Sequence, residues 1–231
     1  MRIVALTAVL AVALAGATGA GARSPKDPTL RTKPADVRLA RTLLVTRADL
    51  PAGIAFVDKG IDKSSNADFQ CKGVQEPDLH RLVETAEIDG HTFEAKSAAG
   101  FTQVQSSASI FRSAREAAVA VGALRSLSSA AAKRCFAAAI RKGLPGGTSI
   151  SQFRFKPLRR TVGGLKLLVW EISLQVQAGG RALPMDLVMA FYERGRAVPM
   201  LMLMNAGTGV DPTLARSLSA GMVAKLETAR L

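Results

Sequence analysis

Hydrophobic and polar residues alternate along most of the second half of the chain, which is the pattern of half-buried β-strands. The even positions from 168 to 176 are apolar and the odd positions from 171 to 177 are polar, so this stretch has one dry and one wet face. Residues 198–204 are apolar on both faces, and we expect them to be covered on both sides. Short glycine-containing turns, suited to antiparallel hairpins, separate four predicted strands, at 149–158, 165–177, 183–193 and 197–205.

The first half of the chain mixes helical and strand patterns. Apolar residues three and four positions apart predict a helix, whereas strict alternation predicts a strand. In order, we expect a helix over 35–46, a strand over 54–57, irregular chain over 58–73, one or two helical turns over 78–85 and a strand over 104–111. The last of these is predicted to be half-buried, with Gln105 on the side opposite Val104.

Helices are predicted for the alanine-rich residues 113–142 and for the C-terminal end. Ser113 is an expected N-cap, and Glu116 three residues later would complete a capping box. The Ser128–Ser129 pair is expected to divide this stretch into two helices. The final helix begins at Asp211–Pro212, an N-cap followed by proline, and its apolar stripe comprises Leu214, Leu218, Met222 and Leu226.

These elements predict an α+β fold. We expect a mostly antiparallel β-sheet of about five to six strands, with helices packed on it and a C-terminal helix. Without its first 22 residues the chain has a length suited to one domain, which we place at 35–231. Residues 23–34 contain three prolines and alternating charge, and they predict a disordered spacer before that domain.

The first 22 residues have the organisation of a secretory signal peptide. One positive charge at Arg2 precedes an apolar run over 3–15, and Ala20-Gly21-Ala22 has the small-x-small form that signal peptidase accepts. An uncleaved membrane anchor is the alternative, because 3–22 is about long enough to span a bilayer. The second half of that segment is rich in glycine, threonine and alanine, so we expect cleavage near Ala22 and a secreted or extracytoplasmic protein.

The two cysteines, Cys71 and Cys135, support this compartment, since an even number in an exported chain suits a disulfide bond. By loop entropy such a bond would contribute on the order of 4 kcal/mol. Two separate buried thiols are the alternative. The two cysteines and the distant histidines His80 and His91 fit no zinc-ligand spacing, so we expect no metal site.

The formal net charge of +13 predicts attraction to polyanions, such as anionic envelope polymers or the anionic head groups of a membrane surface. Two observations argue against nucleic acid as a partner. The protein is predicted to be exported, and it has only one Trp and one Tyr, whereas stacking on bases needs several aromatic residues. A solvated basic surface without a specific partner is the alternative. One of the densest basic groups comprises Arg154, Lys156, Arg159 and Arg160.

Catalytic motifs are missing from the sequence. It contains no nucleophile elbow, no phosphate-binding glycine fingerprint and no His-Glu-x-x-His, so we expect neither an enzyme nor a bound cofactor. The unusual feature is a set of methionines at period two on neighbouring predicted strands: Met185, Met189, Met200, Met202 and Met204. Thioethers fill cores, form adaptable apolar pockets or bind copper(I), and we treat these five residues as candidate ligand-binding residues.

A short helix followed by Leu43-Leu44 and by Asp49-Leu50-Pro51-x-Gly53 resembles a family of exported actinobacterial proteins. The first cysteine, the alternating strand that ends in Phe111 and the alanine-rich helix with the second cysteine extend this resemblance over residues 35–230. Its members are sensor-type domains that occur free, on lipoproteins or on receptor Ser/Thr kinases. The resemblance implies a sensing or ligand-binding role. The chain departs from it in having one possible disulfide and no lipidation cysteine.

We therefore expect a non-catalytic extracytoplasmic binding or sensor domain with an apolar or amphiphilic ligand. Two alternatives stay open: a cell-envelope hydrolase whose site has no recognised motif, and a structural protein that binds anionic envelope polymers.

The disulfide is open to a direct test. Thiol labelling of the denatured but unreduced protein should modify no sulfhydryl, because both cysteines are predicted to be bonded to each other. Labelling after reduction is the control and should modify both Cys71 and Cys135. Two labelled cysteines without reduction would show that the bond does not form.

Overall fold

In the computed structural model, the described residues are 25–61, 77–97, 100–126, 129–143, 148–178, 181–207 and 210–231. The predicted signal peptide, its cleavage site and Cys71 lie outside them, so export and the disulfide stay predictions. Cys135 lies in a helix on one face of the sheet.

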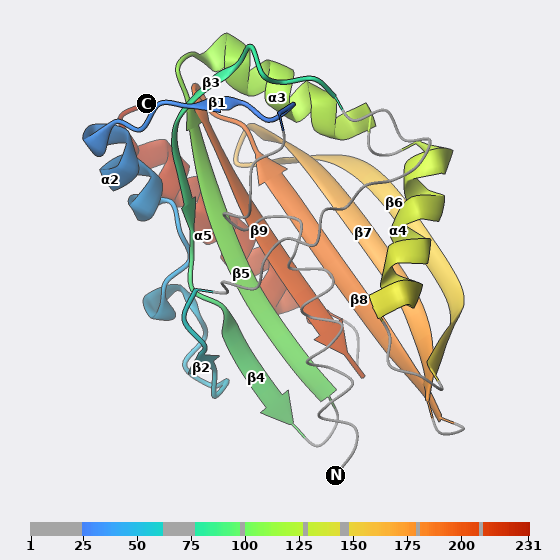
Figure 1. Ribbon diagram of the computed structural model, residues 1–231. Helices are drawn as coiled ribbons and strands as arrows, with labels where there is room; N and C mark the ends of the chain where they lie inside the picture. Colours follow the sequence, from blue (N-terminus) through green and yellow to red (C-terminus); the bar gives the residue numbers. More distant parts are fainter. Residues whose placement is uncertain are drawn as a thin grey trace.

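The centre of the molecule is one nine-stranded sheet (Figure 1). Its order is β1-β3-β5-β9-β8-β7-β6, with β4 beside the first half of β5 and β2 beside β4. All neighbouring strands are antiparallel except β1 and β3, which are parallel. The strands are β1 Thr29–Leu30, β2 Val57–Asp58, β3 Val83–Asp89, β4 Phe93–Ser97, β5 Gly100–Phe111, β6 Thr148–Val162, β7 Leu165–Ala178, β8 Arg181–Tyr192 and β9 Ala197–Ala206.

Helices cover the sheet on both faces. Side chains of α3 (Ala114–Ser126) and α4 (Ala130–Gly143) pack on one face, and those of α2 (Pro34–Thr42) and α5 (Pro212–Thr228) pack on the other. In the view of Figure 1, α3 and α4 lie in front of the sheet and α5 behind it. None of the helices in the described part of the chain combines the length and apolar character needed to cross a membrane.

The predicted meander of four strands is confirmed. Gly163 and Gly164 have φ angles of 55° and 79°, which glycine adopts without steric cost, and they form the two-residue turn between β6 and β7. The alternation along β7 is also confirmed, because Trp170 and Ile172 are buried whereas Ser173 is exposed. Strand β6 is an edge strand of the described sheet. Its bulge after Ser151, its proline and its exposed basic residues discourage pairing with another chain.

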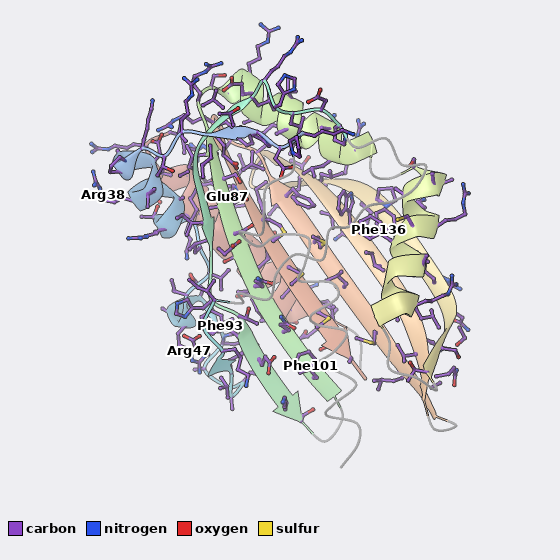
Figure 2. All side chains as sticks on the ribbon, viewed as in Figure 1. Arg38, Arg47, Glu87, Phe93, Phe101 and Phe136 are labelled. Carbon is purple, nitrogen blue, oxygen red and sulfur yellow. The ribbon has the colours of Figure 1, made fainter. Side chains whose placement is uncertain are left out.

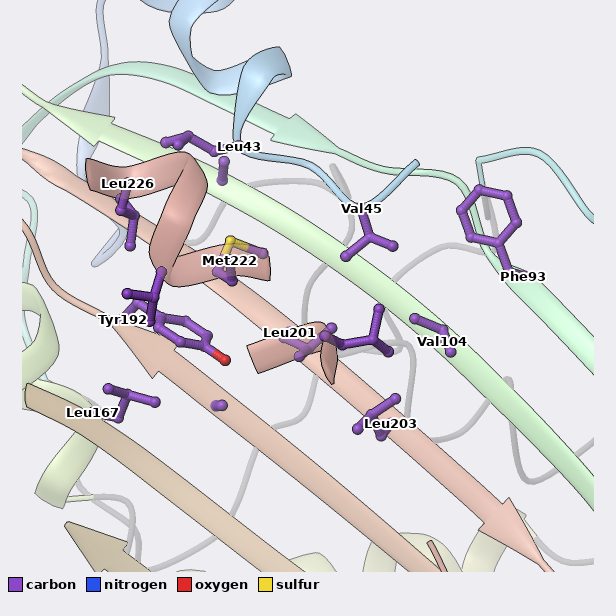
Figure 3. Packing of buried hydrophobic residues seen from close by; sticks show 14 of the residues in the cluster. Leu43, Val45, Phe93, Val104, Leu167, Tyr192, Leu201, Leu203, Met222 and Leu226 are labelled. Atoms are coloured by element: carbon purple, nitrogen blue, oxygen red, sulfur yellow. The ribbon is translucent and has the colours of Figure 1, made fainter. Parts of the chain in front are cut away.

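Strand β9 is buried along its whole length, as predicted from its apolar residues on both faces. The face under α5 carries a contiguous hydrophobic cluster that includes Leu43, Tyr192, Leu201, Met222 and Leu226 (Figure 3). Tyr192 is fully buried, and its hydroxyl donates a hydrogen bond of 2.9 Å to Ser219 Oγ of α5. Burial raises the pKa of Tyr192 to about 12.

Ion pairs attach the peripheral segments to this framework. Asp36 of α2 accepts a 2.6 Å hydrogen bond from Arg196 in the β8–β9 turn and is only 4% exposed. Lys225 of α5 donates to the carbonyl of Leu44 and to Asp49 Oδ2, at 2.5 and 2.7 Å. Both pairs connect segments that are far apart in the sequence, so they fix the position of α2 and of the loop after it.

Several predicted helix ends are confirmed. The Ser113 hydroxyl accepts a hydrogen bond from the Glu116 backbone, but the Glu116 carboxylate bonds to Arg112. The predicted capping box is therefore only half formed. Ser129 accepts a hydrogen bond from the Ala132 backbone at the start of α4, and the division of the alanine-rich stretch is confirmed. Asp211 caps α5 by accepting from the Thr213 backbone.

Four predictions need correction. The sheet has nine strands rather than five or six, and β4 was not predicted. The proposed helical turns at 78–85 are wrong over their last residues, since β3 begins at Val83 and pairs with β5. The expected strand at 54–57 is reduced to β2. The spacer 23–34 is not disordered throughout, because Thr29–Leu30 form β1 against β3. At β1, β3 and β4, pairing with a distant strand overrides a weak local pattern.

The Asp36–Arg196 pair predicts a pH dependence of stability. The hydrogen bond from Arg196 holds the pKa of Asp36 below its ordinary value, so the pair stabilises the fold above that value and is lost as the pH falls through the folded-state pKa. Between about pH 5 and pH 2, the free energy of unfolding of the wild type should fall more than that of Asp36→Asn. Urea unfolding at several pH values measures both. Parallel curves for the two proteins would show that the pair contributes nothing.

Candidate functional site

The five candidate methionines lie on one face of the sheet, below α3 and α4, and we call this the methionine face. Cross-strand pairing places Met189 beside Met202 and Met200 beside Phe191. The same rows continue to Trp170, which pairs with Met189. The sequence prediction that these residues share a face is therefore supported by the register.

The methionine face is core in the described structure. Met185, Met189, Met200, Met202 and Met204 have exposed fractions of 3, 4, 3, 1 and 1% and belong to one buried cluster. Their flexible side chains fill the space between the sheet and its cover, which is the usual role of methionine in an irregular core. The three hollows described for this structure, among them the two discussed below, are not lined by these methionines.

Aromatic residues fix α4 against the same face. Phe136 of α4 stacks on Phe155 of β6, with ring centroids 5.7 Å apart, and meets the edge of Trp170 at 6.3 Å. Trp170 packs against Phe191 at 5.0 Å in a T-shaped arrangement. Figure 2 shows the Phe136 side chain on α4 beside β6 and β7. Such aromatic pairs contribute about 1 kcal/mol each beyond their buried area.

Two glutamines on β5 were missed as core residues. Gln103 and Gln105 face the methionines of β9 and are only 2 and 3% exposed, so the prediction of a half-buried strand is wrong here. The Oε1 atoms of both residues and Nε1 of Trp170 are buried without a hydrogen-bond partner. Each unsatisfied group costs about 1–3 kcal/mol. The sequence carried no local signal of this burial, because it arises from the pairing of β5 with β9.

The histidines form two exposed pairs with aspartates. His80 Nδ1 lies 2.5 Å from Asp78 and His91 Nδ1 lies 2.7 Å from Asp58, and in each pair both side chains are about half exposed. These hydrogen bonds lower the pKa of both aspartates. No described hydroxyl hydrogen-bonds to either ring, and the described residues include no group of three or more potential metal ligands.

A surface hollow of about 380 Å³ lies at the end of the β6–β7 hairpin, and we call it the basic hollow. Four separate segments contribute to it: the C-terminal half of α3, the last residues of β6, the first residues of β7 and the residue after β8. Its floor is apolar and its rim is charged. The lining residues are Val121, Arg125, Arg159, Arg160, Thr161, Lys166, Leu167, Leu168 and Glu193.

The register explains how the basic hollow forms. Arg159 pairs with Leu168, and Thr161 pairs with Lys166, across the β6–β7 hairpin. Alternation places these residues on the same face as Trp170, the face on which α3 packs. Arg125 is in the last turn of α3, where the helix dipole favours a cation. A smaller hollow of about 210 Å³ shares Arg125, Arg159 and Leu168 with the first.

Three cations of the basic hollow have no ion-pair partner within the described part of the chain: Arg125, Arg159 and Lys166. Arg160 differs, because it lies on the other face of the hairpin and donates a 2.5 Å hydrogen bond to Glu171. The sequence had singled out Arg159 and Arg160 as part of one basic group. It carried no signal that Arg125 and Lys166 would join Arg159.

Comparisons with known proteins add little. No protein-family model matches the chain, and no curated protein matches its sequence. Among solved structures, the extracellular domain of PknH from Mycobacterium tuberculosis aligns with 10% identity and a TM-score of 0.38, over 83% of this chain and 96% of that domain. Because a likeness at this level carries no weight for function, the site is interpreted from the residues of this chain alone.

The burial of Met202 gives a test of the methionine face. Met202→Asp should abolish the cooperative melt followed by circular dichroism, because it places an unpaired charge in the core at a cost of several kcal/mol. The control Met202→Leu conserves volume and should cost less than about 1.5 kcal/mol. If Met202→Asp kept the wild-type melt, Met202 would face a water-accessible pocket instead.

Proposed function

We propose that the protein is a non-catalytic binding protein that acts outside the cytoplasm and takes an anionic, phosphate-type group in the basic hollow. The observation that carries this proposal is the convergence of Arg125, Arg159 and Lys166, from three different elements, on one hollow without ion-pair partners. Guanidinium groups form paired hydrogen bonds with phosphate oxygens, and lysine adds a mobile point charge.

The apolar floor strengthens the attraction at this place. Val121 and Leu168 are buried beneath the cations, on the same face of the hairpin, and they shield that side of the hollow from water. A charged ligand above a low-dielectric floor interacts more strongly with its partners than it would in bulk water. The arrangement is also suited to an amphiphile, because apolar groups next to the head group can contact the floor.

The location of the protein is supported by sequence alone. In residues 1–22 a positive charge is followed by an apolar run and then by small residues, which is the order found in a secretory signal peptide. The predicted disulfide suits an oxidising compartment. Outside the cytoplasm, phosphate-type groups are carried by lipid head groups, envelope polymers and free phosphate. The net charge of +13 would draw all three to the protein, and the hollow would supply the specific contacts.

The cations of the hollow give the decisive test. Isothermal titration calorimetry at low salt should show that the wild type binds inorganic phosphate. The triple variant Arg125→Gln, Arg159→Gln, Lys166→Gln should bind it at least about tenfold more weakly, since a hydrogen bond to a charged group contributes about 1.5–3 kcal/mol. All three side chains are exposed on the rim, so the melting temperature should change little.

The matched control is Arg154→Gln, which removes an exposed cation from the same strand at a position outside the hollow. It should bind phosphate like the wild type. Co-sedimentation with vesicles distinguishes the sources of the group: phosphatidic acid vesicles should retain the wild type and release the triple variant if the ligand is a lipid. Equal phosphate binding by wild type and triple variant would disprove the proposal.

A further inference from the structure

The basic hollow also contains one negative charge. Glu193 lies directly after β8 and lines the hollow together with the three unpaired cations. It forms no ion pair with Arg125, Arg159 or Lys166, and it has no other partner among the described residues. Opposite charges that share one hollow without touching leave space between them, so the hollow presents separated positive and negative sites.

The size of the hollow excludes a bare phosphate as its complete occupant. A volume of about 380 Å³ corresponds to about a dozen water-sized groups, at about 30 Å³ each. A phosphate ion occupies only part of this space. A carboxylate in the remaining part would repel a second anionic group and attract a cationic one.

The local pairing of charges points in the same direction. The three cations exceed the one carboxylate by two positive charges, because the charge of Arg160 is already compensated by Glu171. A ligand with a phosphate beside the cations and an ammonium beside Glu193 would place an opposite charge next to each charged side of the hollow. A ligand with phosphate alone would leave Glu193 unpaired next to an anion.

We infer that Glu193 is a specificity-determining residue and that the hollow recognises a zwitterionic group, a phosphate joined by a short linker to an ammonium. The phosphate would accept hydrogen bonds from Arg125, Arg159 and Lys166, and the ammonium would donate to the Glu193 carboxylate. This inference rests on the proposed function, because it uses the same hollow, and it names the class of head group that the hollow prefers.

The experiment compares two soluble probes, inorganic phosphate and phosphoethanolamine, on the wild type and on Glu193→Gln. The wild type should bind phosphoethanolamine more tightly than phosphate. Glu193→Gln should weaken phosphoethanolamine binding about tenfold, because a charge-assisted hydrogen bond is lost. The same variant should bind inorganic phosphate more tightly than the wild type, because a like charge has been removed. Effects of opposite sign on two probes cannot come from partial unfolding.

The control Asp186→Asn removes a carboxylate from β8 at a position outside the hollow, and it should change neither affinity. If Glu193→Gln tightened the binding of both probes, Glu193 would be only a repulsive neighbour, and the inference would be wrong while the proposed function held. If Glu193→Gln left both affinities unchanged, the inference would also be wrong. If the wild type bound neither probe, the proposed function itself would fail.

Discussion

The burial of β9 is the constraint on which the other parts of the structure depend. All ten of its residues are buried, and it pairs with β5 on one edge and β8 on the other. A strand that is apolar on both faces is stable only when both faces are covered, which requires a helical layer on each side of the sheet. The methionines at alternate positions of β9 fill the irregular space under one of these layers, and leucines fill the other.

This constraint also decides where a ligand can bind. Because the centre of the methionine face is occupied by packing, its side chains are not available to a ligand. The β6–β7 hairpin is the place where an edge strand with basic residues meets the last turn of α3. Burial of Leu167 and Leu168 at the base of that hairpin fixes the backbone that carries Arg159 and Lys166. The buried core thus fixes the position of the candidate site, whose charged side chains are exposed at the surface.

Prediction from sequence succeeded where a strong local pattern agreed with the tertiary contacts. The alternation of β7, the paired glycines before it and the Asp211 cap of α5 each contain their own signal. It failed where the environment came from a distant segment: β1 is a strand only because β3 lies beside it, and Gln105 is buried only because β9 and its cover enclose it. For the same reason only a small part of the basic hollow was foreseeable. Arg159 belonged to a visible group, whereas Arg125 and Glu193 joined it through folding alone.

The energetics of the unpaired charges differ sharply between the core and the hollow. The Oε1 atoms of Gln103 and Gln105 are buried without a hydrogen-bond partner, so each of them lowers the stability of the fold. Arg125, Arg159 and Lys166 are exposed and solvated, so their lack of partners costs the fold almost nothing. These exposed cations, arranged around an apolar floor with a carboxylate held apart from them, are therefore available to a ligand at almost no cost to the stability of the fold.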